Sequence, residues 1–260
     1  MKKINILFAI AILLLSNKEL YSQGAAGNSA SFESQKIVDM PTAGMLAKGN
    51  YSVNANIYTP GGIMLDFNAG LFKNFSMGVG FSGVGIIGRD DISFQKMPGF
   101  NLKFRVIDEQ KNIPAIAIGF NSQGHGAWIK NLDRFETMSP GFYLAASKNF
   151  VWSIGEIAAH FGLNYSIEPN SDNKAVNFYL GAEQSIGSNF AINIEYNFNQ
   201  DEKNYKVLSS LGMLNTSFRY SISKGVTLEL ELRDLLQNRI NSGKSKQLER
   251  RLNLELVRAF

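Results

Sequence analysis

The sequence contains no cysteine among its 260 residues, and this absence excludes several kinds of site at once. Without thiols the chain can form no disulfide and no thiolate metal centre, and no lipid can be attached through a cysteine after export. The net charge of +4 is small for a chain of this length, so no nucleic-acid partner is indicated. No residue pattern points to a bound metal or cofactor, and we expect neither.

Long apolar runs are also missing after the first residues. No later segment approaches the roughly 20 apolar residues that a membrane-spanning helix needs. The one apolar run, Ile6 to Leu15, follows two lysines and is succeeded by polar residues up to Ser22. That layout is typical of a secretory signal, so we predict a cleaved signal peptide over residues 1–22 and export through the Sec pathway.

Apolar and polar residues alternate at every second position through about twelve segments, which is the period of a β-strand with one apolar face. In YSVNANIY, for example, Tyr51, Val53, Ala55 and Ile57 lie on one face, and serine and asparagine lie on the other. The segments with this pattern are 51–58, 63–71, 75–83, 100–106, 114–120, 141–147, 156–167, 176–184, 190–198, 214–222, 226–234 and 251–260. Most approach the length that a tilted membrane strand needs.

The connections and the polar face favour a membrane barrel over a soluble β-sandwich. Short and long connections alternate along the chain, as tight periplasmic turns and longer outer loops do. The polar face is rich in glycine, serine and asparagine, which suits a crowded barrel interior. We therefore predict an all-β fold: a transmembrane antiparallel β-barrel of about 12 strands over residues 47–260, in the outer membrane, preceded by a periplasmic N-terminal segment over residues 23–46.

The closing segment RLNLELVRAF predicts a last strand that pairs with the first, because an open sheet edge is not tolerated in hydrocarbon. Phe260 is expected at the periplasmic interface, and Arg258 is near enough to the end to reach it. The pattern also resembles the signal that the bacterial barrel-assembly machinery reads. The residues of this predicted assembly signal are Leu252, Leu254, Leu256 and Phe260. The expected partners are that machinery, outer-membrane lipid and lipopolysaccharide.

The same register predicts that charged side chains of both signs point into the barrel. Acids slightly outnumber bases, so a paired network that fills the lumen is favoured over an anion-selective channel. His160 is expected to belong to this interior network. The predicted members are Asp66, Lys103, Arg105, Glu156, His160, Glu183, Glu195, Arg219, Glu229, Glu231, Arg233, Arg251 and Glu255.

No catalytic residue is predicted, because neither histidine stands with a serine on the outer face, as a barrel phospholipase requires. The longest loop carries His125 and Trp128, which are candidates for contact with a glycan; the alternative is that Trp128 packs on the barrel rim. Asp90 and Asp91 are candidates for holding a divalent cation, or for binding lipopolysaccharide through one, but two adjacent acids are weak evidence and a solvated loop is favoured.

Three stretches resemble a known family: VDMPTAGML (38–46), IPAIAIGFNSQGHG (113–126) and SPGFYLAASKNF (139–150). They are similar to stretches of the YjbH-like outer-membrane β-barrel proteins, which are linked to exopolysaccharide production. Asn121 stands where aspartate is common in that family. The resemblance implies a non-enzymatic envelope protein that assists exopolysaccharide production or export, with polysaccharide as a partner. The alternative is a small passive pore, and a lipid-modifying barrel enzyme is the third hypothesis.

Overall fold

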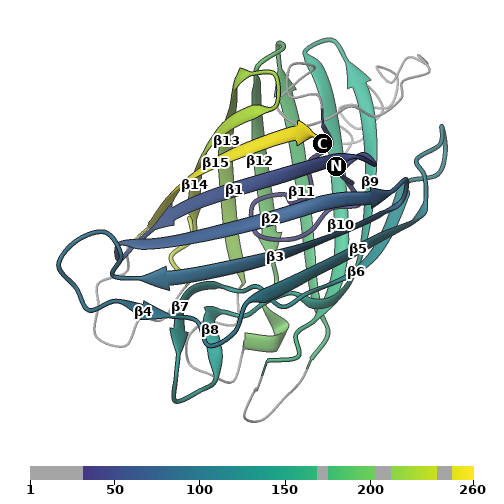
Figure 1. Cartoon of the computed structure of the whole chain (residues 1–260). Coiled ribbons are helices and arrows are strands. Elements are labelled where there is room, and N and C mark those ends of the chain that lie inside the picture. Colours follow the sequence, from purple (N-terminus) through teal and green to yellow (C-terminus); the bar gives the residue numbers. More distant parts are fainter. Residues whose placement is uncertain (1–31, 169–174, 203–211, 239–247) are drawn as a thin grey trace, which may run out of the picture.

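The computed structural model describes residues 32–168, 175–202, 212–238 and 248–260, and these form one closed antiparallel β-barrel (Figure 1). The predicted signal peptide, residues 1–22, lies outside the described residues and stays a prediction. Within the described ranges no helix is both long and apolar enough to cross a membrane.

Twelve strands build the barrel wall, and each pairs with its neighbours in chain order. The sheet closes because β1 pairs with β15 and β2 pairs with β3. The predicted all-β barrel of about 12 strands is therefore confirmed. The wall strands are β1 (Asn50–Tyr58), β2 (Gly62–Phe72), β3 (Phe75–Val84), β5 (Gly99–Ile107), β6 (Ala115–Asn121), β9 (Gly141–Trp152), β10 (Gly155–Tyr165), β11 (Asn177–Ile186), β12 (Phe190–Asn197), β13 (Met213–Ser223), β14 (Val226–Arg233) and β15 (Glu249–Ala259).

Three short strands and one turn of 3₁₀ helix lie in the long connections. They are β4 (Ser93–Phe94), β7 (His125–Ile129), β8 (Arg134–Thr137) and η1 (Gln200–Glu202). β4 pairs with the end of β3, while β7 and β8 pair only with each other. Figure 1 places β4, β7 and β8 together at the lower end of the barrel.

The alternation read from the sequence sorts side chains between the two faces of the wall. In β14, Leu230 is 44% exposed, whereas its neighbour Glu231 is fully buried. Outward positions along the wall are aliphatic or aromatic and exposed, and inward positions are mostly buried serine, asparagine and charged residues. An apolar exterior around a polar interior is the arrangement that lipid requires of a transmembrane barrel.

The last strand is paired to its end, as the sequence predicted. β15 runs against β1 from Asn50 opposite Ala259 to Tyr58 opposite Arg251, and the Phe260 amide donates to the Gly49 carbonyl. The Phe260 ring stacks on Tyr51, with their centroids 5.8 Å apart. This contact anchors the terminus on the outer face, and the role of the segment as an assembly signal stays a prediction.

The lipid face gives a direct test of the inward and outward register. We expect Leu230→Arg to reduce the stability of the barrel in lipid by about 2–4 kcal/mol, since it places a charge toward hydrocarbon. Glu231→Gln should cost less, because the amide oxygen can still accept the hydrogen bond that Asn56 donates to Glu231. Denaturant titration of folding into lipid vesicles measures both effects. Equal responses at the two positions would contradict the register.

Candidate functional site: a lumen closed by the N-terminal segment

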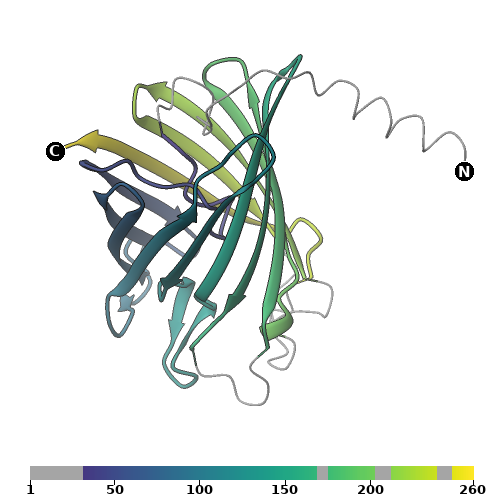
Figure 2. The ribbon, with the colours of Figure 1, turned by 90° about the vertical axis from the view of Figure 1, so that its right-hand side faces the viewer.

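Residues 32–48, which we call the plug segment, run inside the barrel and not outside it. Ile37, Val38, Ala43 and Leu46 are all fully buried. Figure 2 shows the purple start of the described chain within the ring of strands. Residues 32–46, predicted as a periplasmic N-terminal segment, therefore lie inside the barrel, where this stretch finds its polar and apolar partners on the inner wall. Residues 23–31 lie outside the described residues.

One wall carboxylate holds the backbone of the plug segment at its turn. Glu195 Oε2 accepts hydrogen bonds from the amides of Val38, Asp39 and Met40 at 3.0, 2.9 and 2.8 Å. Its other oxygen accepts from the Asn215 side chain at 2.9 Å. Three successive amides around one oxygen form the kind of anion-binding concavity that peptide backbones make. The amides of the plug segment thereby compensate the buried charge of Glu195.

A second anchor, which we call the Asp39 clasp, consists of Asp39, His125, Arg233, Glu249 and Arg251. Arg233 Nε donates to Asp39 Oδ2 at 2.6 Å, and Arg233 Nη1 donates to Glu249 at 2.6 Å. Arg251 Nε donates to Glu249 at 2.6 Å and its Nη1 donates to His125 Nδ1 at 2.9 Å. The clasp therefore joins the tip of the plug segment to β14, β15 and the loop strand β7.

The protonation of the clasp follows from its surroundings. Burial alone would raise the pKa of the Asp39 carboxyl, but Arg233, His125 and Arg251 together hold that pKa well below its usual range. Burial lowers the pKa of His125 to about 3, with Asp39 opposing that shift. At neutral pH, Asp39 is therefore ionised and His125 is a neutral hydrogen-bond acceptor for Arg251.

Cations of the wall bind the carbonyls of the plug segment. Lys103 donates to the carbonyls of Gln35 and Gly44 at 2.8 and 3.0 Å, and Arg105 Nε donates to the Ala43 carbonyl at 3.1 Å. Arg105 also pairs with Glu33 through both of its terminal nitrogens. The plug segment is thus attached along its length by side chains from β5, β12, β14 and β15.

Arg219 is the centre of a third group of charges. It lies 3.2 Å from Glu183 and 2.9 Å from Glu229, and its Nη2 donates to the carbonyls of Lys36 and Ile37 at 3.0 Å. Lys36 of the plug segment lies 3.5 Å from Glu231. Charged groups of the wall therefore pair with one another directly, as Arg219 does with Glu183 and Glu229, and they also bind charges of the plug segment such as Lys36.

The other predicted network members are placed less tightly. Asp66 and Glu255 are half-buried and line a cavity beside the plug segment. Glu156 is half-buried at the start of β10, and its backbone amide donates to the Ser185 hydroxyl at 2.8 Å. Lys103 was expected to pair with an acid; in the described part of the chain its ammonium binds backbone carbonyls instead, because the plug segment occupies that side of the lumen.

His160 has a serine partner that sequence reasoning missed. β9 and β10 place Ser147 opposite His160, and the Ser147 hydroxyl lies 2.8 Å from His160 Nδ1. The same hydroxyl accepts the Ala43 amide of the plug segment at 2.9 Å, while the buried Nε2 of His160 has no partner among the described residues. The Ser147 hydroxyl therefore connects His160 to the plug segment and serves as a docking point for it.

The predicted glycan-contact loop needs a correction at His125. His125 is only 8% exposed and is enclosed in the Asp39 clasp, so it is not available to an external glycan. The charged partners below the loop draw the imidazole into the lumen. Trp128 is half-buried and packs edge-on against Phe135, with ring centroids 4.9 Å apart. Asp90 and Asp91 are exposed.

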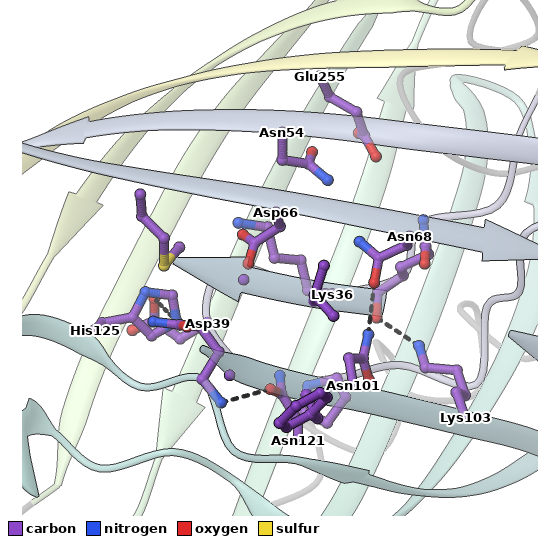
Figure 3. Close-up of a pocket in the computed structure, with 18 of the residues that line it drawn as sticks. Lys36, Asp39, Asn54, Asp66, Asn68, Asn101, Lys103, Asn121, His125 and Glu255 are labelled. Atoms are coloured by element: carbon purple, nitrogen blue, oxygen red, sulfur yellow. Dashed lines mark hydrogen bonds and ion pairs between the residues drawn. The ribbon is translucent and has the colours of Figure 1, made fainter. Parts of the chain in front are cut away.

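A cavity of about 90 Å³ remains between the plug segment and the inner face of β1, β2, β3, β5 and β6. Figure 3 shows labelled side chains from β1, β2, β5 and β6 around Lys36 and Asp39 of the plug segment. For comparison, an engineered protein cavity of about 150 Å³ holds one benzene molecule. The described residues therefore leave less room than that in this cavity beside the docked plug segment.

The closed wall, the apolar exterior and the polar, plugged interior define a transmembrane β-barrel of the outer-membrane type. Among solved structures, the chain is similar to the KdgM porin, with a TM-score of 0.48 and 9% sequence identity over 81% of this chain and 99% of that one. It is also similar to the KdgM porin in complex with disordered oligogalacturonate, with a TM-score of 0.47, 9% identity and coverage of 81% and 99%. The NanC porin gives a TM-score of 0.44 at 8% identity, again over 81% and 99%.

No family model matches the sequence, and no curated protein matches it. The resemblance to the YjbH-like family therefore stays a prediction.

The plug anchors can be tested because the chain has no native cysteine. A single Ala43→Cys substitution puts a thiol at a fully buried position of the plug segment. We expect Asp39→Asn to increase the rate of maleimide labelling there, since breaking a buried ion pair costs roughly 3–5 kcal/mol. Glu195→Gln should act in the same direction, because it removes the charge on which three amides converge.

Ile113→Cys, at an exposed position, is the control for reagent access. Labelling at Ala43→Cys that remains equally slow in both anchor variants would show that these contacts do not hold the plug segment.

Proposed function

We propose that this protein is a non-enzymatic, porin-like passive route for small polar solutes across the outer membrane, closed by its own plug segment. The observation that carries the proposal is the way the plug segment is held. Carboxylates, guanidinium groups and an ammonium of the wall bind its backbone and its charges. A polar docking surface of this kind can exchange its partners for water, whereas an apolar core cannot.

The plug segment does not join the barrel sheet, which supports a removable closure. Among the described plug residues, the only β-bridge joins Lys36 to Pro41 and so lies within the segment itself. Apolar packing is limited to small clusters, such as Ala43 against Ala115 and Ala117. Departure of the segment would break no wall strand pairing and would leave a lumen lined by groups that water can solvate. That lumen would be an aqueous path.

Assistance to exopolysaccharide production or export is the second candidate. The three stretches that resemble the YjbH-like family meet in space: 38–46 lies in the plug segment, while 113–126 and 139–150 contain the paired strands β6 and β9. Ala43 of the first stretch contacts the other two through Ala115 and Ser147. This convergence supports a shared structural unit. A polysaccharide strand is far larger than the 90 Å³ cavity, so its passage would also require the plug segment to leave.

Conductance separates a gated route from a permanently filled scaffold. Arg105→Ala removes the hydrogen bond to the Ala43 carbonyl and the pair with Glu33. We expect this variant to show higher conductance or more frequent openings in planar bilayers than the unaltered protein, because Glu33 loses its partner and the plug segment loosens. Arg258→Ala, outside the lumen and exposed, is the matched control and should leave the current unchanged.

A clear fall in anion current in Arg105→Ala would mean that the arginine lines an open path and that the closure model is wrong. A second outcome would refute the pore. If labelling shows that the plug segment is released, and Arg105→Ala, Asp39→Asn and Glu195→Gln still show no conductance, the protein is a scaffold and not a pore.

A further inference from the structure

The cavity beside the plug segment is bordered by a surface of carboxamides, which we call the amide wall: Asn54, Asn68, Asn101, Asn121 and Gln123. The strand register brings three of them into one row, in which Asn68 lies opposite Gly78, Gly78 opposite Asn101, and Asn101 opposite Asn121. The Asn101 amide donates to Asn68 at 3.0 Å, as Figure 3 shows. The row crosses β2, β3, β5 and β6 without a charged side chain.

Glycine keeps this wall flat. A Cβ at Gly78 would lie 2.0 Å from the Asn68 side-chain oxygen, and one at Gly80 would lie 2.3 Å from an Asp66 carboxylate oxygen. A side chain at either position would displace the polar group that now faces the lumen. The wall therefore presents polar groups to the lumen and contributes no bulk to fill it.

Tyr143 supplies a hydrogen-bonding group with no partner. It is 5% exposed, its ring lies against Gly119, and it lines the same cavity. Its buried hydroxyl has no hydrogen-bond partner among the described residues. A buried polar group without a partner costs free energy, so this hydroxyl is a site where an incoming polar molecule gains a hydrogen bond. Asn54 lines the same cavity and adds a carboxamide that can both donate and accept.

The charges around the cavity cancel. The wall contributes two cations, Lys103 and Arg219, and two carboxylates, Asp66 and Glu255, so its charges cancel with or without the plug segment. The plug segment adds Lys36 and Asp39, which also cancel. His125, which also lines it, is neutral. No net field therefore favours an anion or a cation. Carboxamides and a phenol both donate and accept, and a sugar hydroxyl group does the same.

We propose that the amide wall is a binding surface for uncharged, polyhydroxylated solutes of the saccharide class; this rests on the proposed function and names its solute. A hexose is larger than benzene, and the cavity beside the docked plug segment is smaller than the cavity of about 150 Å³ that holds benzene. Sugar and plug segment therefore compete for the same side of the lumen. Sugar binding favours the released state, and release of the plug segment strengthens sugar binding.

The test measures sugar binding by the purified full chain, independently of conduction. Saturation-transfer NMR with glucose gives the dissociation constant in the Asp39→Asn background, with Glu195→Gln as a second background. In each, Tyr143→Phe and Asn54→Ala should weaken glucose binding about twofold to tenfold per hydrogen bond lost. Tyr220→Phe makes the same chemical change on the 42% exposed outer face and should have no effect. Heat-dependent gel mobility verifies that each variant is folded.

Glucuronate, the anionic counterpart of glucose, should bind no more tightly than glucose. The proposal is overturned if glucuronate binds more tightly, if glucose binds in neither background, or if Tyr143→Phe and Asn54→Ala together leave its dissociation constant unchanged. If Tyr143→Phe and Asn54→Ala weaken glucose binding but the barrel never conducts, the sugar-binding role of the amide wall is supported and the pore is refuted. If the barrel conducts but neither substitution changes the affinity for glucose, the pore is supported and the sugar-binding role of the amide wall is refuted.

Discussion

A closed barrel of twelve strands encloses more space than the side chains of this wall fill, and the interior of the protein follows from that constraint. Closure itself is required because unpaired backbone groups are not tolerated in hydrocarbon. Smaller barrels fill their interior from the wall alone. Here much of the inner face of β2, β3, β5 and β6 is glycine or asparagine, so the remaining space has to be occupied by water or by another segment of the chain. The plug segment is that occupant.

The lumen is divided into two halves of different chemistry. Strands β11 to β15 carry the carboxylates and guanidinium groups that hold the plug segment, among them Glu195, Arg219 and Arg233. The facing strands β1, β2, β3, β5 and β6 border the cavity with amides and glycine, and β5 also holds the plug segment through Lys103 and Arg105. The plug segment and the remaining space therefore lie side by side.

Buried charges are costly, so their number here calls for a physical reason. Replacing an interior ion pair by apolar residues is often neutral or stabilising, so the network is not explained by stability alone. What the charges provide is a docking surface with a defined register: Glu195 accepts three successive amides, and Asp39 meets two arginines and a histidine. An occupant held in this way is bound in one position and yet can be exchanged for water without breaking strand pairing in the wall.

The strands, their order and the side of the wall that each side chain faces were determined by the sequence itself. Alternation has a period of two, so once the apolar face is known, Leu230 must point to lipid and Glu231 to the lumen. The pairing of β15 with β1 follows from the same closure argument. Local pattern carries this information because it concerns neighbours in the chain or in adjacent strands.

Which inward groups meet was decided only by the tertiary structure. Arg105 and Glu33, or Asp39 and Arg233, are far apart in sequence and come together because the plug segment enters the barrel. Nothing in residues 32–48 repeats with a strand period, so their place could not be deduced from pattern. The sequence likewise predicts His125 to lie in an exposed loop, but its contacts with Asp39 and Arg251 place it in the Asp39 clasp. Such contacts depend on three-dimensional proximity and charge, which a one-dimensional pattern does not contain.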